Sequence, residues 1–221
     1  IGPDAAAEIG AVVARLEALG LGDTPLYLES LRYRGAALRA TGAPEAPDVL
    51  ARAAALAEDR HGPAHSTTLD LRLLLARALI DHDRSDEALG VLAGIVQTAE
   101  ELYGRRGYAY QAALPKLVRL EYRRERHAES LAYAERLVES LEATGAGSGT
   151  LANWVHFIGA NQVHLGRFDE AERSARRALA LRAEGLGPDH VHVHVDRTWL
   201  AAALLGLDRP AEVEDVLAPV F

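Results

Sequence analysis

The chain of 221 residues has no cysteine and no methionine, and only 5% of its residues are aromatic. Without cysteine there can be neither disulfides nor thiolate metal sites, which fits a reducing compartment, and we expect a cytoplasmic location. The sequence has no run of about 18 apolar residues, so we expect no membrane-spanning segment. The formal net charge of −8 argues against a general nucleic-acid binder, which needs a basic stripe.

Runs of β-branched residues are scarce, whereas the good helix formers Ala, Leu, Arg and Glu are abundant. The composition therefore predicts an all-α protein. The chain opens with Ile1-Gly2-Pro3 and shows no signal-peptide pattern. We expect a fragment of a longer protein or a processed chain, and the alanine- and arginine-rich composition favours a bacterial source.

One short pattern recurs at a nearly constant period. We call the residue after a recurring Glu the marker residue. The marker residues follow one another at intervals of 42, 42, 41 and 42: Ala46, Ala88, Ser130, Ala171 and Val213. Four positions before them stand Gly42, Arg84, Arg126, Arg167 and Arg209. A fixed period in this range predicts stacked supersecondary units, with the small marker residue where helices cross closely.

Apolar residues at helical spacing between these turns predict a lone helix over Ala5–Leu19 and then five helix pairs. The expected pairs are Pro25–Arg39 with Pro44–Glu58, Thr67–Asp81 with Ser85–Leu102, Tyr108–Tyr122 with His127–Ala143, Leu151–Leu165 with Phe168–Ala183, and His190–Leu205 with Pro210–Leu217. Pro115 lies inside one of these helices, where it removes a hydrogen bond. It predicts a kink, or a helix that starts only near Ala113.

The segment IGANQVHLGRFDEAERSARRALA, Ile158–Ala180, and the GLGPDH that spans Gly185–His190 carry a family resemblance. They resemble the tetratricopeptide repeat (TPR), in the long variety of about 42 residues found in kinesin light chains and in many bacterial regulatory proteins. The family core is LG-x-x-Y-x-x-x-G-x-Y-x-E-A, and Gln162 replaces its usual aromatic. A weaker copy of the linker runs from His61 to His65.

The resemblance implies a single domain over residues 1–221, built as a right-handed α-solenoid of antiparallel helix pairs. About five TPR-like repeats would follow a partial one, at 1–22, 23–62, 63–104, 105–146, 147–187 and 188–221. Arrays that resemble this type are often the sensor or docking portion of larger signalling proteins. The resemblance also implies a structural role for the linker histidines His65 and His190.

In the resembling family, the first helix of each pair lines a concave face that holds a peptide or protein segment. Carried over by the marker residues, the expected contact positions are Asp70, Leu73, Arg77, Asp81, Arg119, Tyr122, Arg123, Asn153, His156, His164 and Thr198. Arg77 and Arg119 hold the same repeat position, and paired guanidinium groups suit a carboxylate or phosphate. An equally weighted alternative is that both arginines pair with Asp70, Asp81 or another acidic neighbour.

No nucleophile elbow, phosphate loop or HExxH motif is present, so we expect no enzyme and no cofactor. The leading hypothesis is a protein- or peptide-binding scaffold, or the regulatory sensor module of a signalling protein.

Two alternatives stay open. One is self-assembly through the chain ends, where Leu16, Leu217 and Phe221 are apolar, which would give an end-to-end homo-oligomer in place of a monomer. The other is a metal site formed by His190, His192 and His194 with histidines of the preceding unit. It is the less favoured because zinc needs three or four converging ligands.

Overall fold

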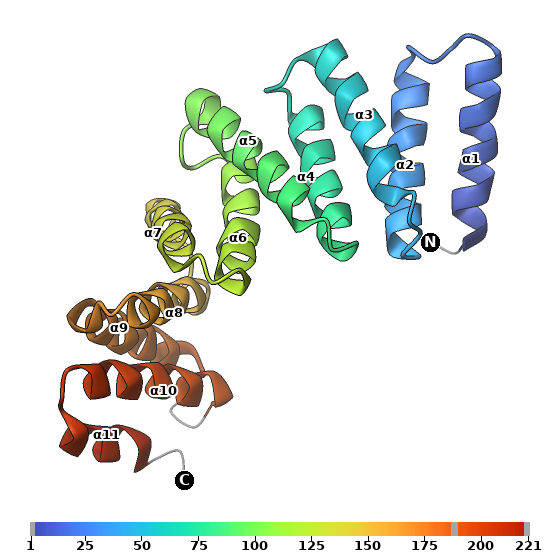
Figure 1. Cartoon of the computed structure of the whole chain (residues 1–221). Coiled ribbons are helices and arrows are strands. Elements are labelled where there is room, and N and C mark those ends of the chain that lie inside the picture. Colours follow the sequence, from blue (N-terminus) through green and yellow to red (C-terminus); the bar gives the residue numbers. More distant parts are fainter. Residues whose placement is uncertain (1–2, 187–189, 219–221) are drawn as a thin grey trace. The chain divides into compact units, whose positions relative to one another are not determined.

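The computed structural model describes residues 3–186 and 190–218, which form eleven α-helices and no β-strand (Figure 1). The helices are α1 Pro3–Ala18, α2 Pro25–Ala40, α3 Ala46–His61, α4 Ser66–Asp81, α5 Ser85–Tyr103, α6 Tyr108–Arg123, α7 His127–Ala143, α8 Ser148–His164, α9 Phe168–Leu186, α10 Val191–Gly206 and α11 Pro210–Leu217. The predicted all-α class and the alternation of helix pairs are confirmed. The linker residues 187–189 of the GLGPDH segment lie outside the described part.

The helices are grouped into two compact units, Ile1–Ala113 and Leu114–Phe221. In unit 1 each helix from α1 to α5 packs on the next, and in unit 2 the same holds from α7 to α11. First helices of neighbouring pairs also touch, α2 with α4 and α8 with α10. This packing of each helix on its sequence neighbours and on the next pair is that of an α-solenoid.

The boundary between the units falls inside α6, beside Pro115. We expected Pro115 to kink this helix or to delay its start to about Ala113. The delayed start is wrong, because α6 is helical from Tyr108 and carries the proline in its interior. Neighbouring side chains of α6, among them Leu114 and Leu117, are buried, and this burial favours the helix despite the missing N–H.

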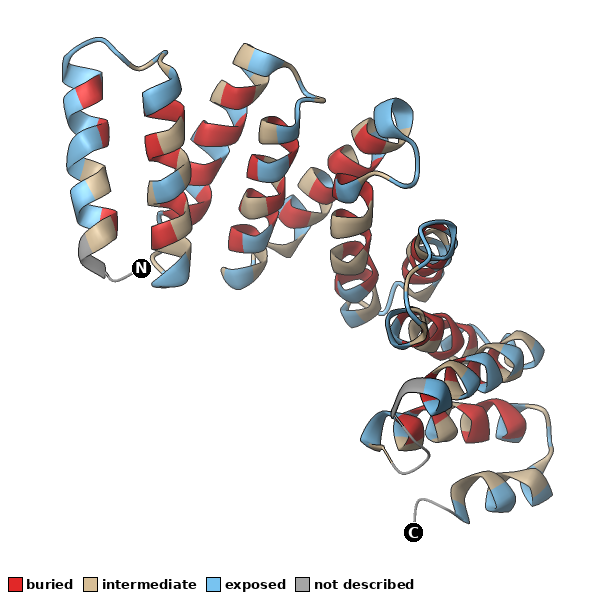
Figure 2. Ribbon diagram, turned by 180° about the vertical axis from the view of Figure 1, so that it is seen from behind, coloured by how far each residue is buried: buried red, intermediate tan, exposed pale blue. Residues whose placement is uncertain are grey.

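Most of the marker residues lie in the buried interior between helices. Four of them, Ala46, Ala88, Ser130 and Ala171, are 0% exposed, whereas Val213 in the last helix is partly exposed. In the helices of those four residues, the residue four positions later is also buried. In Figure 2 the buried residues lie on the helix sides that face other helices, and the exposed residues lie on the outer sides. The expectation that small residues stand at close helix crossings is confirmed for these four pairs.

The turns inside the pairs share one backbone feature. A residue with a left-handed backbone ends each first helix: Gly42, Asp83, Glu125, Gly166 and Asp208, with φ between 57° and 71°. Gly42 is therefore the structural counterpart of Asp83, and not of Arg84 as the sequence alignment placed it. The turn of the first pair has one residue fewer between this position and the marker residue.

The arginine that follows the residue with the left-handed backbone forms hydrogen bonds between neighbouring second helices. Arg84 donates to both carboxylate oxygens of Glu87 at 2.7 and 2.8 Å and also to Asp48 of α3, at 3.2 Å. These bonds hold the pKa of Glu87 below its ordinary value, because they favour the ionised carboxylate. Arg209 repeats the arrangement with Glu212 and with Glu172 of α9. The recurring Arg and Glu of the sequence pattern thus connect adjacent repeats.

In unit 1 the core joins α1 to the first pair. Val13 and Leu16 of α1 pack with Tyr27, Leu28 and Leu31 of α2. Leu16 is only 7% exposed, so its assignment as an apolar contact at an open end is wrong. Of the two residues cited for self-assembly at the other end, Leu217 is partly exposed and Phe221 lies outside the described part.

In unit 2 a buried ion pair joins α9 to α10. Arg182 and Asp196 are 4% and 1% exposed, and the guanidinium donates to Asp196 Oδ2. Arg182 also donates to Asn153 of α8 at 3.0 Å, and Asp196 Oδ1 lies 2.6 Å from His156 Nδ1. These four side chains form a polar relay that spans α8, α9 and α10 and fixes the His156 ring. A buried charge of this kind is stable only while its partner is present.

Gly35→Ala is expected to lower the free energy of unfolding by about 1–2 kcal/mol, as overpacking does. A Cβ at Gly35 would lie 2.5 Å from Cδ2 of Leu50, which is 0% exposed and has no room to move. Gly90→Ala is the matched control, because a Cβ there meets nothing within 4 Å. It should stabilise the chain by up to about 1 kcal/mol through helix propensity alone. Urea unfolding of both variants measures the two changes in the free energy of unfolding. Changes of the same sign would contradict the close packing of Leu50 on Gly35.

Asp196→Asn is expected to destabilise unit 2 by about 3–5 kcal/mol, because it leaves the Arg182 charge buried without a counter-charge. Thermal unfolding followed by circular dichroism measures the loss. Glu170→Gln is the control, since the Arg167–Glu170 pair is exposed and such pairs contribute little. A smaller effect of Asp196→Asn than of Glu170→Gln would show that the buried pair is not important for stability.

Candidate binding surface on the first helices

In unit 1 the expected contact residues on α4 behave differently from one another. Asp70 and Arg77 are exposed, and Arg77 has no hydrogen-bond or ion-pair partner among the residues that the structure describes. Asp81 pairs with Arg39 of α2 at 2.8 Å, not with Arg77. Leu73 is only 4% exposed, so its assignment as a contact residue is wrong and it belongs to the core. The position of Leu73 faces inward because it lies on the stripe of α4 that packs on neighbouring helices.

In unit 2 the corresponding arginine of α6 lies over an aromatic ring. The guanidinium carbon of Arg119 is 5.4 Å from the ring centroid of Trp154, a cation–π distance, and Arg119 is exposed. The alternative that Arg77 and Arg119 pair with acidic neighbours has no support within residues 3–186 and 190–218. Arg123, one helical turn beyond Arg119, is also exposed and has no ion-pair partner in the same residues.

Rings from four helices gather beside Arg119. We call Tyr122, His127, Phe157, His164 and Trp199 the ring cluster. Phe157 and His164 of α8 meet Tyr122 of α6 at centroid distances of 5.4 and 5.8 Å, and Trp199 of α10 lies 5.6 Å from His164. His127 at the start of α7 stacks on His164 at 4.1 Å, with 4° between the ring planes. His164 is exposed and Tyr122 and Trp199 are partly exposed, so the cluster presents open ring area to a ligand.

Hydrogen bonds fix the orientation of the cluster. Asn161 is 0% exposed and its amide donates to Ser130 Oγ and to the Phe157 carbonyl, at 2.9 and 2.8 Å. Its carbonyl oxygen is then the acceptor for His127 Nδ1 at 3.2 Å, which places the proton of His127 on Nδ1. On the other side of the stack, the Tyr122 hydroxyl lies 3.2 Å from His164 Nε2.

Burial and the neighbouring His127 lower the pKa of His164, so its ring is neutral at neutral pH. Burial also raises the pKa of Tyr122, which keeps the phenol protonated. The rings of His164 and Tyr122 are therefore uncharged at neutral pH. Positive charge beside the cluster comes from Arg119 and Arg123, and Glu125 adds negative charge near His164.

Three further expected contact positions, Asn153, His156 and Thr198, differ in how they relate to the ring cluster. Asn153 and His156 are members of the polar relay, which orients His156 with its Nδ1 on Asp196. The rings of His156 and Trp199 are 6.3 Å apart, so the relay adjoins the ring cluster. Thr198 is exposed, and its hydroxyl donates only to the Val195 carbonyl of its own helix. The structure thus brings Arg119, Tyr122, His156 and His164 together around rings that the sequence reasoning left out, namely Phe157 and His127.

The histidines at the start of α10 cap the helix. His190 Nδ1 accepts from the His192 N–H at 3.2 Å, and His65 Nδ1 accepts from the Thr67 N–H at 3.3 Å at the start of α4. These N-caps confirm the structural role of the linker histidines. His194 instead bonds with Arg197. In the described ranges, no three His, Asp or Glu side chains gather as a metal-binding group.

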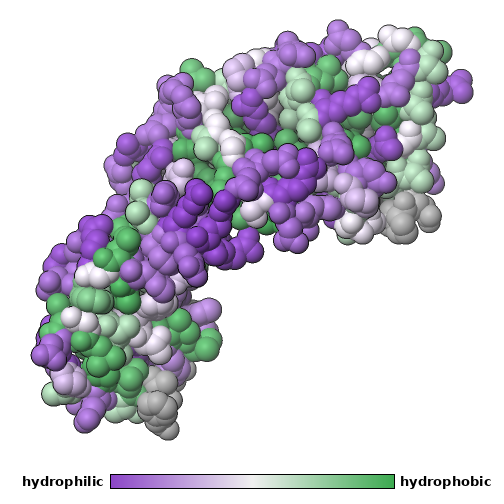
Figure 3. Space-filling model, viewed as in Figure 1, coloured by the Kyte–Doolittle hydropathy of each residue, from purple (hydrophilic) through white to green (hydrophobic). Residues whose placement is uncertain are grey.

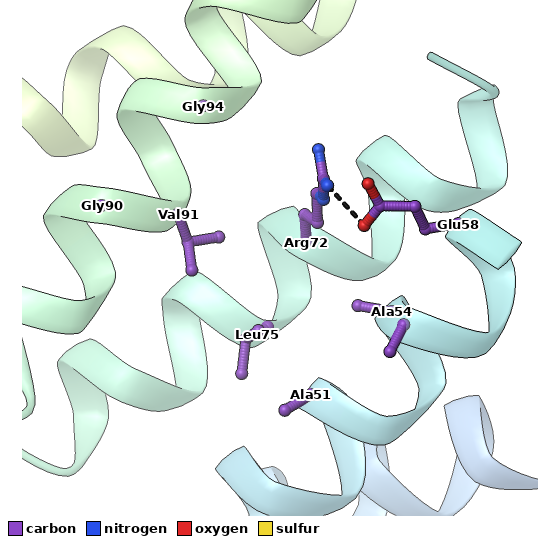
Figure 4. Close-up of a pocket in the computed structure, with 9 residues that line it drawn as sticks. Ala51, Ala54, Glu58, Arg72, Leu75, Gly90, Val91 and Gly94 are labelled. Carbon is purple, nitrogen blue, oxygen red and sulfur yellow. Dashed lines mark hydrogen bonds and ion pairs between the residues drawn. The ribbon is translucent and has the colours of Figure 1, made fainter. Parts of the chain in front are cut away.

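A cavity of about 360 Å³ lies between the second helices of unit 1, away from the expected contact positions (Figure 4). Leu75 of α4 forms its floor, and Ala54 of α3 and Val91 of α5 face into it. Glu58 and Arg72 form an ion pair of 2.6 Å at one end. Sequence reasoning missed this cavity, because its walls are small residues that give no apolar signal.

Much of the surface seen in Figure 3 is hydrophilic, with apolar areas between the charged residues. Several large side chains are exposed, among them Leu26 and Tyr108. No helix in the described part has the length and apolar character needed to cross a membrane.

Comparison with known proteins gives structural relatives only. No protein-family model matches the sequence, and a search of curated proteins also gave no match. Among solved structures, the chain is similar to a putative kinesin light chain from Podosopora anserina with nearly identical TPR-like repeats. The TM-score is 0.71 and the identity 20%, over 87% of this chain and 92% of the other.

The chain is also similar to BtubC (BKLC) from P. vanneervenii, with a TM-score of 0.70 and 16% identity. That match covers 96% of this chain and 87% of the other. Three observations point to the same fold. They are the helix pairs with a period near 42 residues, the buried small marker residues and the similarity to these two solved structures. The chain therefore has the TPR-like helical-repeat fold seen in kinesin-light-chain repeats.

Proposed function

We propose that the protein is a non-enzymatic scaffold or regulatory module that binds an acidic protein or peptide segment on its first helices. The observation that carries the proposal is the state of Arg77 and Arg119. Both are exposed at the same repeat position, and neither has an acidic partner among the described residues. Many other arginines of the chain are in ion pairs, including Arg39, Arg52 and Arg84. Unpaired guanidinium groups are well suited to carboxylates.

In unit 2 the ligand would meet Arg119 and Arg123 as charges and the ring cluster as an apolar, stacking surface. Tyr and Trp side chains supply large contact areas at low conformational cost. The polar relay holds His156 in one orientation, so its free Nε2 is a positioned hydrogen-bonding group. Rigid groups of this kind reduce the entropy lost on binding. Asn153 and Thr198 belong to the rim of the same surface, and Asp70 and Arg77 to its counterpart in unit 1.

Self-assembly is the weaker candidate, because Leu16 is buried and is not available for end-to-end contact. Sedimentation velocity over a range of concentrations separates the two functions. A monomer that binds acidic peptides supports the scaffold, and a concentration-dependent oligomer without peptide binding contradicts it.

In the variant that combines Arg77→Ala with Arg119→Ala, each unit is expected to lose at least about 10-fold in affinity for an acidic peptide, since one lost charge-assisted hydrogen bond contributes about 1.5–3 kcal/mol. The peptide is selected from a phage-displayed random library and its affinity measured by fluorescence polarisation. Helicity by circular dichroism should stay unchanged, because both side chains are exposed. Arg106→Ala, an exposed arginine in the α5–α6 turn, is the control and should have little effect. Equal losses in the control and the double variant would overturn the assignment.

A further inference from the structure

The cavity between α3 and α5 is bounded by small residues on both sides. Ala51 and Ala55 stand one turn apart on α3, and Gly90 and Gly94 one turn apart on α5. In Figure 4, Val91 and Leu75 close its apolar side, while Arg72 reaches across to Glu58 at its end. The cavity lies wholly within unit 1, and its volume falls in the range of ligand pockets.

Other second helices of the chain carry an arginine at the position that corresponds to Gly94. Six residues after the marker residue, Arg52 of α3 donates to Glu17 of α1 at 2.7 Å. The same position in α9 is Arg177, which donates to Glu142 of α7. In both cases the arginine crosses from one second helix to a glutamate near the end of the preceding one.

The sequence repeats both partners of this pair. The glutamates recur at Glu17, Glu58, Glu100 and Glu142, at intervals of 41, 42 and 42. The crossing position recurs at intervals of 42, 42 and 41: Arg52, Gly94, Arg136 and Arg177. Gly94 is the exception in this series. It stands where an arginine would reach Glu58, and the cavity lies beside it.

The packing of the chain gives no reason for glycine at this place. A Cβ added at Gly94 or at Gly90 meets nothing within 4 Å. Glycine inside a helix is destabilising relative to almost any other residue, so the exposed Gly90 and the partly exposed Gly94 weaken α5. Gly35 is different, since the closeness of Leu50 excludes any side chain there. The fold therefore tolerates side chains at Gly90 and Gly94, yet the space is open.

We propose that this cavity receives an arginine side chain presented by a partner protein, which takes the place that Arg52 and Arg177 fill in their own repeats. The aliphatic stem would lie between Val91, Leu75 and the glycine wall of α5. The guanidinium would bind Glu58. The proposal concerns the second helices of unit 1 and is independent of the proposed peptide surface on the first helices.

Glu58 has capacity for a second arginine. Arg72 binds its Oε2 at 2.6 Å, and no hydrogen-bond partner of Oε1 lies among the described residues. The chain already contains a carboxylate with one arginine on each oxygen. Glu172 accepts from Arg176 on Oε1 at 2.8 Å and from Arg209 on Oε2 at 2.7 Å. A carboxylate flanked by two guanidinium groups is thus an arrangement that this fold can hold.

A double-mutant cycle tests the geometry without a ligand. Gly94→Ala should raise the Tm by about 2–4 °C through helix propensity. Gly94→Arg should raise it further, by at least about 2 °C, because the new side chain reaches Glu58. Glu58→Gln should abolish this additional increase in Tm and leave the Tm increase caused by Gly94→Ala unchanged. If the Tm of Gly94→Arg exceeds that of Gly94→Ala by the same amount with and without Glu58→Gln, the guanidinium does not reach the carboxylate. The proposal then fails.

Binding is measured with two alanine-based helical peptides that differ only in a central arginine or its uncharged analogue citrulline. Chemical shifts of the Leu75 and Val91 methyl groups are followed by NMR. The arginine peptide should bind at least about 10-fold more tightly than the citrulline peptide, a difference of one charge-assisted contact. Gly94→Arg should remove the shifts by filling the cavity, whereas the control Gly94→Ala should keep them.

Equal binding of both peptides would make the cavity a purely apolar pocket and overturn the proposal, as would binding that survives Gly94→Arg. An absence of shifts at millimolar peptide overturns it as well. A concentration-dependent dimer that Gly94→Arg dissociates would identify the occupant as a second copy of the chain, and the partner-protein proposal would fall.

Discussion

Close contact between helices at a fully buried small residue is the constraint on which the rest of the structure depends. Ala46, Ala88 and Ala171 satisfy it with a methyl group alone. Ser130 brings a hydroxyl into the same crossing, and a buried hydroxyl needs partners. It donates to the Val118 carbonyl and accepts from Asn161. Through that one polar atom the packing of α7 determines which side chain α8 must carry.

The consequences of Ser130 extend to the surface of unit 2. Asn161, held by Ser130, fixes the tautomer of His127, and His127 stacks on His164. His164 in turn meets the Tyr122 hydroxyl. The ring cluster is therefore oriented from the core outward. A binding surface that is built in this way loses little freedom when a ligand arrives.

Much of the fold could be predicted from the sequence because it depends on local and periodic signals. The marker residues gave the period, and the helix limits agree with the structure to within a few residues for most helices, as at Pro25 and Ser85. Gly42 was misaligned by one residue because a glycine and an aspartate can both adopt the left-handed backbone. The start of α6 was misjudged because packing around Pro115 outweighs the lost hydrogen bond.

The candidate site was less predictable. Exposed arginines follow from their repeat position, but Leu73 was taken as a contact although it faces the core. Arg182 and Asp196 were missed, since a buried charged pair between α9 and α10 depends on two residues distant in sequence. Asp196 does leave a signal, because it stands in the apolar stripe between Val193 and Leu200. The cavity depends on side chains that are absent, which no apolar pattern can reveal.

The open space beside Gly94 also bears on how the chain comes apart. In a helical-repeat array, stability is close to a sum of contributions from neighbouring repeats. Between α3 and α5, the hydrogen bond from Arg84 to Asp48 connects one end of the two helices, and the cavity lies between their other parts. The coupling between neighbouring repeats should then be weakest between α3 and α5. We expect α1 to α3 to unfold together while α4 and α5 stay folded.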